Sequence, residues 1–285
     1  MKPFSVVIPT RNNCSMKNGS LLAVLECLER SADAIEDVAV VDNASTDQRL
    51  CIQPGAWRNR VVFTSFDAQP HIGAARNLGV RYTRGPFVVF IDDDMMLPGD
   101  SLLRLATQVH EDAFWTCAQR RYLPWGTQVE HVRSAAKRGD LDWFTSHSTP
   151  VPGCDRIEQR FQALYRPTFI GSFGIVPRAM FEQVGGFDEA FTGWGGEDTD
   201  LLVRLLAVAP LVPMFKQHVG YHYDHVISPY RLLDRDNASR RLGEKLHRQG
   251  QDFDIVLFSE AVIRGDDVSR WNVSLEHQRR LAATR

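Results

Sequence analysis

The sequence predicts an α/β fold in which helices flank a mostly parallel central sheet. Short runs rich in β-branched residues alternate with stretches of helical periodicity, which is the pattern of successive strand–helix–strand units. Polar residues directly follow three of the expected strands. The chain has 285 residues, of which 44% are hydrophobic, so it can bury the core that such a sheet requires.

Each expected element of the first 117 residues follows from a local pattern. An apolar β-branched run that stops at a polar loop indicates a buried strand, and leucines three or four positions apart indicate a helix. Asn18 or Ser20 is expected to cap the first helix, and Asp100 or Ser101 a later one. These patterns predict strands at 4–8, 38–41, 61–63 and 86–91, and helices at about 20–30, 73–82 and 101–109.

The second half of the chain is less regular. Residues 118–170 hold several Pro, Gly and Trp residues and are interpreted as a loop-rich or antiparallel insert over the binding pocket. Pro177 is expected to begin a short helix that ends at Gly185 and Gly186. An apolar helix follows at 201–208, and the residues from 228 onward resemble surface helices.

Composition excludes several classes of protein. The 33 basic and 35 acidic residues give a net charge of −2, which argues against a nucleic-acid partner. The five cysteines contain no Cys-x-x-Cys pair, so they are expected to be small core residues in a reducing compartment. No apolar run is long enough for a signal peptide or a membrane span, and the expected location is therefore the cytoplasm.

Three consecutive aspartates, Asp92, Asp93 and Asp94, follow the most strand-like run of the chain. Adjacent carboxylates repel one another, and a cation is their usual compensation. In an extended backbone the first and third would point to the same side. Hard ions such as Mg²⁺ or Mn²⁺ prefer carboxylate ligands. The alternative is a solvated acidic turn or a helix cap.

The segment from Gly193 to Asp200 combines glycines, one tryptophan and several acids. Glu197 and Asp198 are expected at the start of a helix, where the helix dipole favours their ionised form. An ionised carboxylate beside an aromatic ring suits a general base for a sugar hydroxyl. The alternative is an ordinary helix terminus with capping acids, with Trp194 in the core.

Histidines and one arginine complete the set of candidate residues. Any of His218, His222 and His225 could complete an oxygen-rich metal site, although a histidine is more often a packed or an exposed residue. Arg76 is expected on a helix that starts near the edge of the sheet, where its guanidinium suits a phosphate. A surface salt bridge is the alternative for Arg76.

Four motifs in order resemble the family 2 glycosyltransferases of the GT-A fold. They are Ser-Val-Val-Ile-Pro-Thr-Arg-Asn, Val-Val-Asp-Asn-Ala-Ser-Thr-Asp, Ala-Ala-Arg-Asn and Phe-Ile-Asp-Asp-Asp. The later stretch Val-Gly-Gly-Phe-Asp-Glu-Ala-Phe-Thr-Gly-Trp-Gly-Gly-Glu-Asp is similar to the acceptor-side motif of chondroitin-polymerase-like members. It is also similar to that of β4-galactosyltransferases and polypeptide N-acetylgalactosaminyltransferases. The resemblance covers about residues 4–225.

The resemblance implies a role for each matching residue on the donor side. Pro9, Thr10 and Arg11 would lie under the nucleotide base, and Asp42 would accept a hydrogen bond from uracil. Arg76 would lie near the base and the diphosphate. Asp92 to Asp94 match the Asp-x-Asp motif, so that Asp92 and Asp93 would belong to the nucleotide-sugar site. Asp94, together with His222, would hold Mn²⁺ or Mg²⁺.

On the acceptor side, Trp194, Gly195 and Gly196 would shape the binding site. Asp198 would be the catalytic base, and Glu197 would bind sugar hydroxyls. The second motif departs from the family's more usual Asp-Asp-Gly-Ser, because it has Asp42-Asn43-Ala44-Ser45. That change removes one charge near the base.

The implied organisation is a GT-A catalytic domain over 1–227 with a helical extension over 228–285. Residues 1–117 would bind the nucleotide and 118–227 the acceptor. The implied reaction moves a sugar from a nucleotide-diphosphate donor, expected to be a UDP-sugar, to a hydroxyl of a glycan, lipid, peptide or small natural product, with inversion. The alternatives are a sugar-phosphate nucleotidyltransferase and a non-catalytic carbohydrate-binding protein. Basic and apolar residues at 231–248 also allow contact with a membrane surface.

Overall fold

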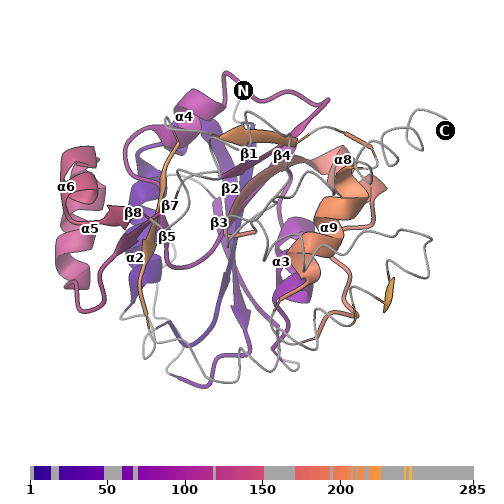
Figure 1. Cartoon of the computed structure of the whole chain (residues 1–285), viewed down its shortest axis with the longest axis horizontal. Coiled ribbons are helices and arrows are strands. Elements are labelled where there is room, and N and C mark those ends of the chain that lie inside the picture. The colour runs from indigo at the N-terminus through magenta and orange to yellow at the C-terminus, as the bar shows by residue number, and fades with distance from the viewer. Residues whose placement is uncertain are drawn as a thin grey trace, which may run out of the picture.

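The computed structural model defines a central sheet with helices on both faces (Figure 1). The residues that it describes are 3–13, 19–47, 60–66, 70–117, 120–150, 171–192, 195–206, 208–209, 211–214, 218–225, 241 and 244–245.

The central sheet has seven strands in the order β10-β6-β9-β4-β1-β2-β3. The four strands β4, β1, β2 and β3 run parallel, and β9 is antiparallel to both of its neighbours. The strands are β1 (Phe4–Thr10), β2 (Ile35–Asn43), β3 (Arg60–Phe66), β4 (Phe87–Ile91), β6 (Phe114–Cys117), β9 (Phe173–Pro177) and β10 (Leu211–Met214).

A second sheet of four short strands lies beside the first, in the order β5-β11-β7-β8. It brings residues from distant parts of the chain next to the end of β4, because β5 starts only four residues after β4. Its strands are β5 (Met95–Met96), β7 (Arg120–Leu123), β8 (Thr149–Pro150) and β11 (Gly220–Tyr223).

The helices form two layers, one on each face of the central sheet (Figure 1). The first layer contains α2, α4, α5, α6 and a short 3₁₀ turn at Ala32–Ala34. The second layer is formed by α3, α8 and α9. The bounds are α2 (Ser20–Glu29), α3 (Ile72–Arg81), α4 (Ser101–Leu105), α5 (Val129–Arg138), α6 (Leu141–Ser146), α8 (Arg178–Gln183) and α9 (Glu197–Leu206).

Strand β1 shows why the central strands are apolar without alternation. Val6 and Ile8 pack in the layer that contains α2, whereas Val7 packs in the layer that contains α3. Because both faces of the strand are covered, every residue of β1 is buried. Helix α3 approaches so closely that a Cβ on Gly79 would overlap the side chain of Val7.

The predicted strands and the helix over 73–82 are confirmed, but two details of the predicted helices are wrong. Ser20 does not cap α2, because its hydroxyl donates to the carbonyl of Asp93 (2.8 Å) and Gly19 occupies the cap position with φ 74°. Helix α4 ends at Leu105 rather than 109. Asp100 occupies its N-cap position as predicted, but the carboxylate pairs with Arg104 and accepts no capping hydrogen bond.

The insert predicted as loop-rich or antiparallel contains two helices, so that prediction is wrong in part. β7 and β8 are antiparallel, but α5 and α6 lie between them and α5 packs against α2. Arg133 of α5 pairs with Glu26 of α2 (2.7 Å). Residues 151–170 lie outside the described part of the chain.

The helical extension predicted over 228–285 also lies almost wholly outside the described residues, of which it includes Arg241, Glu244 and Lys245. The division at residue 227 therefore stays a prediction. Among the described residues, no helix combines the length and the apolar character needed to cross a bilayer.

Replacing Phe90 with alanine should lower the free energy of unfolding by about 3–5 kcal/mol. Phe90 is fully buried on β4, and its ring lies 5.4 Å from that of Phe181 and 5.2 Å from that of Phe187. Urea unfolding would measure the loss. Trp125→Ala is the control, because 53% of Trp125 is exposed and its removal should change stability by about 0.5 kcal/mol or less. Equal effects of the two variants would contradict this assignment of the core.

Candidate active site

The candidate site lies at the carboxyl ends of β1, β2 and β4, where ligands bind in open α/β sheets. Thr10, the last residue of β1, lies in register with Asp42 near the end of β2. The three consecutive aspartates follow β4 immediately. The fold therefore brings the donor-side candidates from three separate motifs to one edge of the sheet.

The loops after β1 and β2 are tied to each other. The Asn12 side-chain oxygen accepts a hydrogen bond from the amide of Thr46 (2.7 Å), and the amide of Asn12 donates to the Ser45 hydroxyl (3.0 Å). The Asp42 carboxylate accepts a bond from the amide of Ser45 (3.0 Å) and stays partly exposed. Arg11, in the loop after β1, is exposed. Pro9, which precedes Thr10 in β1, is buried.

The three aspartates have three different partners. Asp92 accepts a hydrogen bond from Arg76 (3.0 Å), and Asp93 accepts bonds from the side chains of Thr10 (2.6 Å) and Asn13 (3.1 Å). Asp94 points toward histidines. The extended backbone expected for Asp92 to Asp94 is wrong, because the chain turns directly after Ile91, but both Asp92 and Asp94 act electrostatically on His222. Asp93 is 1% exposed, so its contacts favour a structural role in holding the loop after β1.

Asp94, His222 and His225 form a group that could hold a metal ion. Nε2 of His222 lies 3.5 Å from one Asp94 carboxylate oxygen, and Nε2 of His225 lies 3.1 Å from the other. The pairing of His222 with Met95, between β11 and β5, produces this proximity. One ligand atom from each residue lies within 4.8 Å of the others.

The chemistry of this group fits a divalent ion. One carboxylate and two imidazoles form a donor set suited to Mn²⁺-class ions. Burial, outweighing the nearby Asp94 carboxylate, lowers the pKa of His222, which favours the neutral imidazole that binds metals. His218 is not part of the group, and burial lowers its pKa to about 4.

Arg76 joins the donor side of the site to the acceptor side. Its buried guanidinium donates to Asp92 (3.0 Å), to Glu197 (3.3 Å) and to Asp198 (2.9 Å). Burial acts to lower the pKa of Arg76, but the three carboxylates raise it above its usual value, so the group stays charged. The residue expected to contact the nucleotide thus holds three acidic side chains in place.

Glu197 and Asp198 begin α9 and share Arg76 as a partner. Burial, reinforced by the charge of Asp198, raises the pKa of Glu197 from 4.5 to about 7. Although 29% of the Asp198 side chain is exposed, surrounding protein desolvates it and raises its pKa, with Arg76 opposing the shift. Raised carboxyl pKa values increase basicity, which suits a proton acceptor.

The glycines before α9 adopt backbone conformations that side chains disfavour. Gly195 has φ 94° and Gly196 has φ 88°, so the turn into the helix requires residues without a Cβ. The carbonyl of Gly196 accepts the first helical hydrogen bond, from Asp200 (2.9 Å). Trp194, expected in the acceptor site, lies outside the described residues.

Gly171 is a site residue that the sequence analysis missed. Its amide donates to the second carboxylate oxygen of Asp198 (3.0 Å), and a Cβ at this position would overlap Asp198 and lie 2.7 Å from Nη1 of Arg76. The weak signal for it was a Gly-Ser pair just before an apolar strand. Its lack of a side chain lets the ion pair rest against the backbone.

Arg120 is the second residue that the sequence analysis missed. It precedes Tyr122 by two positions in β7, and the Tyr122 ring contacts His222 with ring centroids 5.3 Å apart. Alternation along the strand therefore places Arg120 on the face of the second sheet that carries His222. Its guanidinium donates to the Ser172 hydroxyl (3.2 Å). Among the described residues it makes no ion pair with a carboxylate, but its charge acts on both Asp198 and His222.

Comparison with known proteins identifies the family. Residues 5–185 match the family described as Glycosyl transferase family 2, and residues 157–225 match the N-terminal domain of galactosyltransferase. The chain belongs to glycosyltransferase family 2. It is 30% identical over 241 residues to a validoxylamine A glucosyltransferase of Streptomyces hygroscopicus subsp. jinggangensis, covering 78% of this chain and 56% of the relative. This chain spans about half the length of the validoxylamine A glucosyltransferases that it matches.

Two solved structures of glycosyltransferases show the same fold. GalNAc-T7 with UDP, GalNAc and Mn²⁺ superposes with a TM-score of 0.60 at 12% identity, over 97% of this chain and 55% of that one. A Pyrobaculum calidifontis mannosyltransferase with GDP-Man and Mn²⁺ gives 0.55 at 18% identity, over 99% and 75%. The predicted GT-A fold, with a mostly parallel sheet between helices, is therefore confirmed.

Gly171→Ala should lower the turnover of this glycosyltransferase family member by at least about tenfold. The new Cβ would displace the carboxylate of Asp198, and displacements of about 1 Å at a catalytic group can cost about a hundredfold. Release of the nucleoside diphosphate from a nucleotide sugar would measure the effect. Gly126→Ala is the control, because Gly126 has φ 88° and no atom lies within 4 Å of where its Cβ would be. It should strain the backbone without slowing turnover. An equal loss of turnover in both variants would contradict the role of Gly171.

Glu197→Gln should stabilise the protein more at pH 8 than at pH 5. Folding raises the pKa of Glu197 from 4.5 to about 7. Between these two pH values the folded chain therefore binds the proton of Glu197 more tightly than the unfolded chain does. The wild type therefore loses this contribution to stability as pH rises from about 4.5 to 7, whereas the amide does not titrate. Urea unfolding of both proteins at the two pH values would measure it. Glu130→Gln, at an exposed position of α5, is the control substitution. A pH-independent difference for Glu197→Gln would refute the shift.

Proposed function

We propose that this chain is a metal-dependent glycosyltransferase that moves a sugar from a UDP-sugar to an acceptor hydroxyl with inversion. The observation that carries the proposal is the position of Asp198 relative to Asp94. Asp198 and Asp92 bind the same guanidinium, and Asp94 follows Asp92 by two residues. A proton acceptor and a metal-binding group therefore lie on one edge of the sheet.

On the donor side, the loops after β1 and β2 form the floor for the nucleotide base, with Thr10, Arg11 and Asp42 beside it. Asp94, His222 and His225 would hold the divalent ion, which when bound supplies Lewis-acid stabilisation of the diphosphate leaving group. Arg120 would offer its guanidinium to the same diphosphate, because phosphates suit its fork of donors. The presence of Mn²⁺ in the GalNAc-T7 and Pyrobaculum calidifontis mannosyltransferase complexes supports this arrangement.

On the acceptor side, Asp198 accepts the proton of the attacking hydroxyl. Arg76 and the amide of Gly171 hold its two carboxylate oxygens, so its orientation is fixed before the acceptor binds. Preorganisation of this kind lowers the entropic cost of the reaction. Attack from the side opposite the leaving group would invert the anomeric centre. Glu197, buried beside it, would orient sugar hydroxyls.

The acceptor could be a glycan, a lipid, a peptide or a small natural product. The name of the streptomycete relative supports testing small polyhydroxylated compounds first. Family membership disfavours the nucleotidyltransferase alternative. A non-catalytic binding protein would show no turnover, either with Asp198 or without it. One experiment therefore separates it from an enzyme.

Asp198→Asn should lower the rate of UDP release by about 10²–10⁴-fold while leaving UDP affinity in Mn²⁺ within about threefold, because general-base contributions have that size. Asp94→Asn should instead weaken UDP binding in Mn²⁺ and leave binding in EDTA unchanged. A screen of nucleoside-diphosphate sugars with Mn²⁺ comes first, and calorimetry gives the UDP affinities.

Asp142→Asn, an exposed substitution on α6, is the matched control and should behave as wild type in both assays. Full turnover in Asp198→Asn would overturn the assignment of the base. Retained stereochemistry in the product, measured by NMR of the anomeric coupling, would overturn inversion alone.

A further inference from the structure

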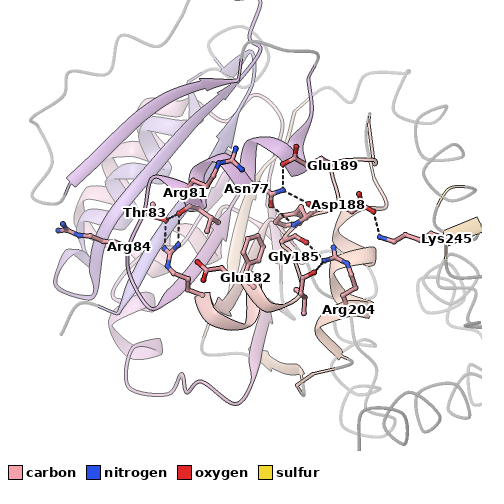
Figure 2. A pocket seen from close by; sticks show the side chains of 16 residues that line it. Asn77, Arg81, Thr83, Arg84, Glu182, Gly185, Asp188, Glu189, Arg204 and Lys245 are labelled. Atoms are coloured by element: carbon pink, nitrogen blue, oxygen red, sulfur yellow. Dashed lines mark hydrogen bonds and ion pairs between the residues drawn. The ribbon is translucent and has the colours of Figure 1, made fainter. Parts of the chain in front are cut away.

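The loop at 186–192, which connects α8 to the residues before α9, is held on its inner side by α3 and the residue that precedes it. The Asn77 amide donates to the carbonyl of Phe187 (2.8 Å) and accepts from its amide (2.9 Å). Nε2 of His71 lies 2.7 Å from the carbonyl of Glu189. Figure 2 shows Asn77 directed toward this loop. Because Asn77 follows Arg76, the helix that binds the catalytic carboxylates also holds this loop.

A lysine from the C-terminal part of the chain holds the loop on its outer side. Nζ of Lys245 lies 2.6 Å from a carboxylate oxygen of Asp188 and 2.5 Å from one of Asp200 (Figure 2 shows the first pair). The same ammonium lies 5.6 Å from the ring centroid of Phe191. Lys245 therefore links the loop to the first turn of α9.

Arg241 contacts the same loop one helical turn earlier in the sequence. Its guanidinium donates to the Thr192 hydroxyl (2.8 Å) and to the carbonyl of Ala190 (3.2 Å). The two cations thus contact four of the five residues from Asp188 to Thr192, all except Glu189. These contacts favour packing of this segment on the catalytic domain, the ordinary alternative to a membrane-bound tail.

The contact between Lys245 and Asp188 is an ion pair, because the Asp188 carboxyl is ionised. Partial burial acts to raise the pKa of Asp188, but Lys245 and the amide of Ala190 lower it below its usual range. Asp200 is 2% exposed and also binds Arg204 through two contacts of 2.6 and 2.9 Å. Loss of Lys245 would therefore leave Asp200 paired, and would remove only the connection between helix and loop.

We propose that Lys245 and Arg241 are positioning residues that fix the 186–192 loop against α9 and thereby hold Glu197 and Asp198 in place. Asp200 lies in the first turn of α9 with Glu197 and Asp198. Contacts that fix Asp200 therefore also fix the backbone of these two residues. The C-terminal segment is in this sense part of the catalytic domain. We call the contacts of Lys245 and Arg241 with the 186–192 loop and Asp200 the clamp. The effect of the clamp on turnover rests on the function proposed above, whereas the clamp itself does not.

Lys245→Met tests the clamp in the full-length chain. Hydrogen exchange measured by mass spectrometry should be faster in peptides from 186–200, because the loop has lost its outer contact. With a UDP-sugar and Mn²⁺, release of UDP into water should fall three- to tenfold, while UDP affinity stays within twofold. Lys245→Arg should restore at least half of the turnover, because the guanidinium can bridge the same two carboxylates.

Lys137→Met is the matched control, because Lys137 also pairs with a carboxylate, that of Glu26 (3.3 Å), but on α5. It should leave exchange at 186–200 and turnover unchanged. Asp188→Asn gives a second variant that breaks the same link from the loop side and should reproduce both effects of Lys245→Met. Unchanged exchange at 186–200 in both Lys245→Met and Asp188→Asn would overturn the clamp.

Faster exchange with wild-type turnover would overturn its role in positioning the catalytic carboxylates. Absence of UDP release by the wild type, with faster exchange in the variants, would overturn the proposed function and leave the clamp standing.

Discussion

A single buried guanidinium determines how the site is assembled. Arg76 of α3 binds Asp92 after β4 and Glu197 and Asp198 at the start of α9, residues that lie 16 to 122 positions away in the sequence. Three carboxylates around one cation leave an excess of negative charge, and removal of the cation would leave those charges buried without compensation. The position of α3 on the sheet therefore sets the positions of the other two elements.

The excess negative charge has a consequence for the ligand. Four carboxylates lie at one edge of the sheet, those of Asp92, Asp94, Glu197 and Asp198. Arg76 forms ion pairs with all of them except Asp94. A divalent ion at Asp94 and the guanidinium of Arg120 would offset this charge and at the same time attract a diphosphate. A site that is acidic alone would repel a nucleotide sugar, so the ion and the donor are expected to bind together.

The sequence predicted the central strands well because each is covered on both faces and so is apolar throughout, as β1 and β4 show. It predicted the acidic candidates because three aspartates after a strand are conspicuous. It could not predict Gly171 or Arg120, whose importance depends on contacts with residues more than twenty positions away. It missed the two helices of the insert, although α5 is amphipathic and ends at Gly139 with φ 65°. The packing of α5 on α2 is a long-range contact that the structure alone reveals.

Neighbouring residues of α3 act on both parts of the acceptor side. Arg76 fixes the carboxylates of α9, and Asn77 fixes the loop that leads to them. Since one rigid helix carries both residues, the loop and the first turn of α9 cannot shift independently on their inner side. The outer side has no such helix among the described residues, and Lys245 with Arg241 supplies the contacts there. The Arg-Asn pair therefore sets the geometry between Asp92, at the edge of the sheet, and the two carboxylates at the start of α9.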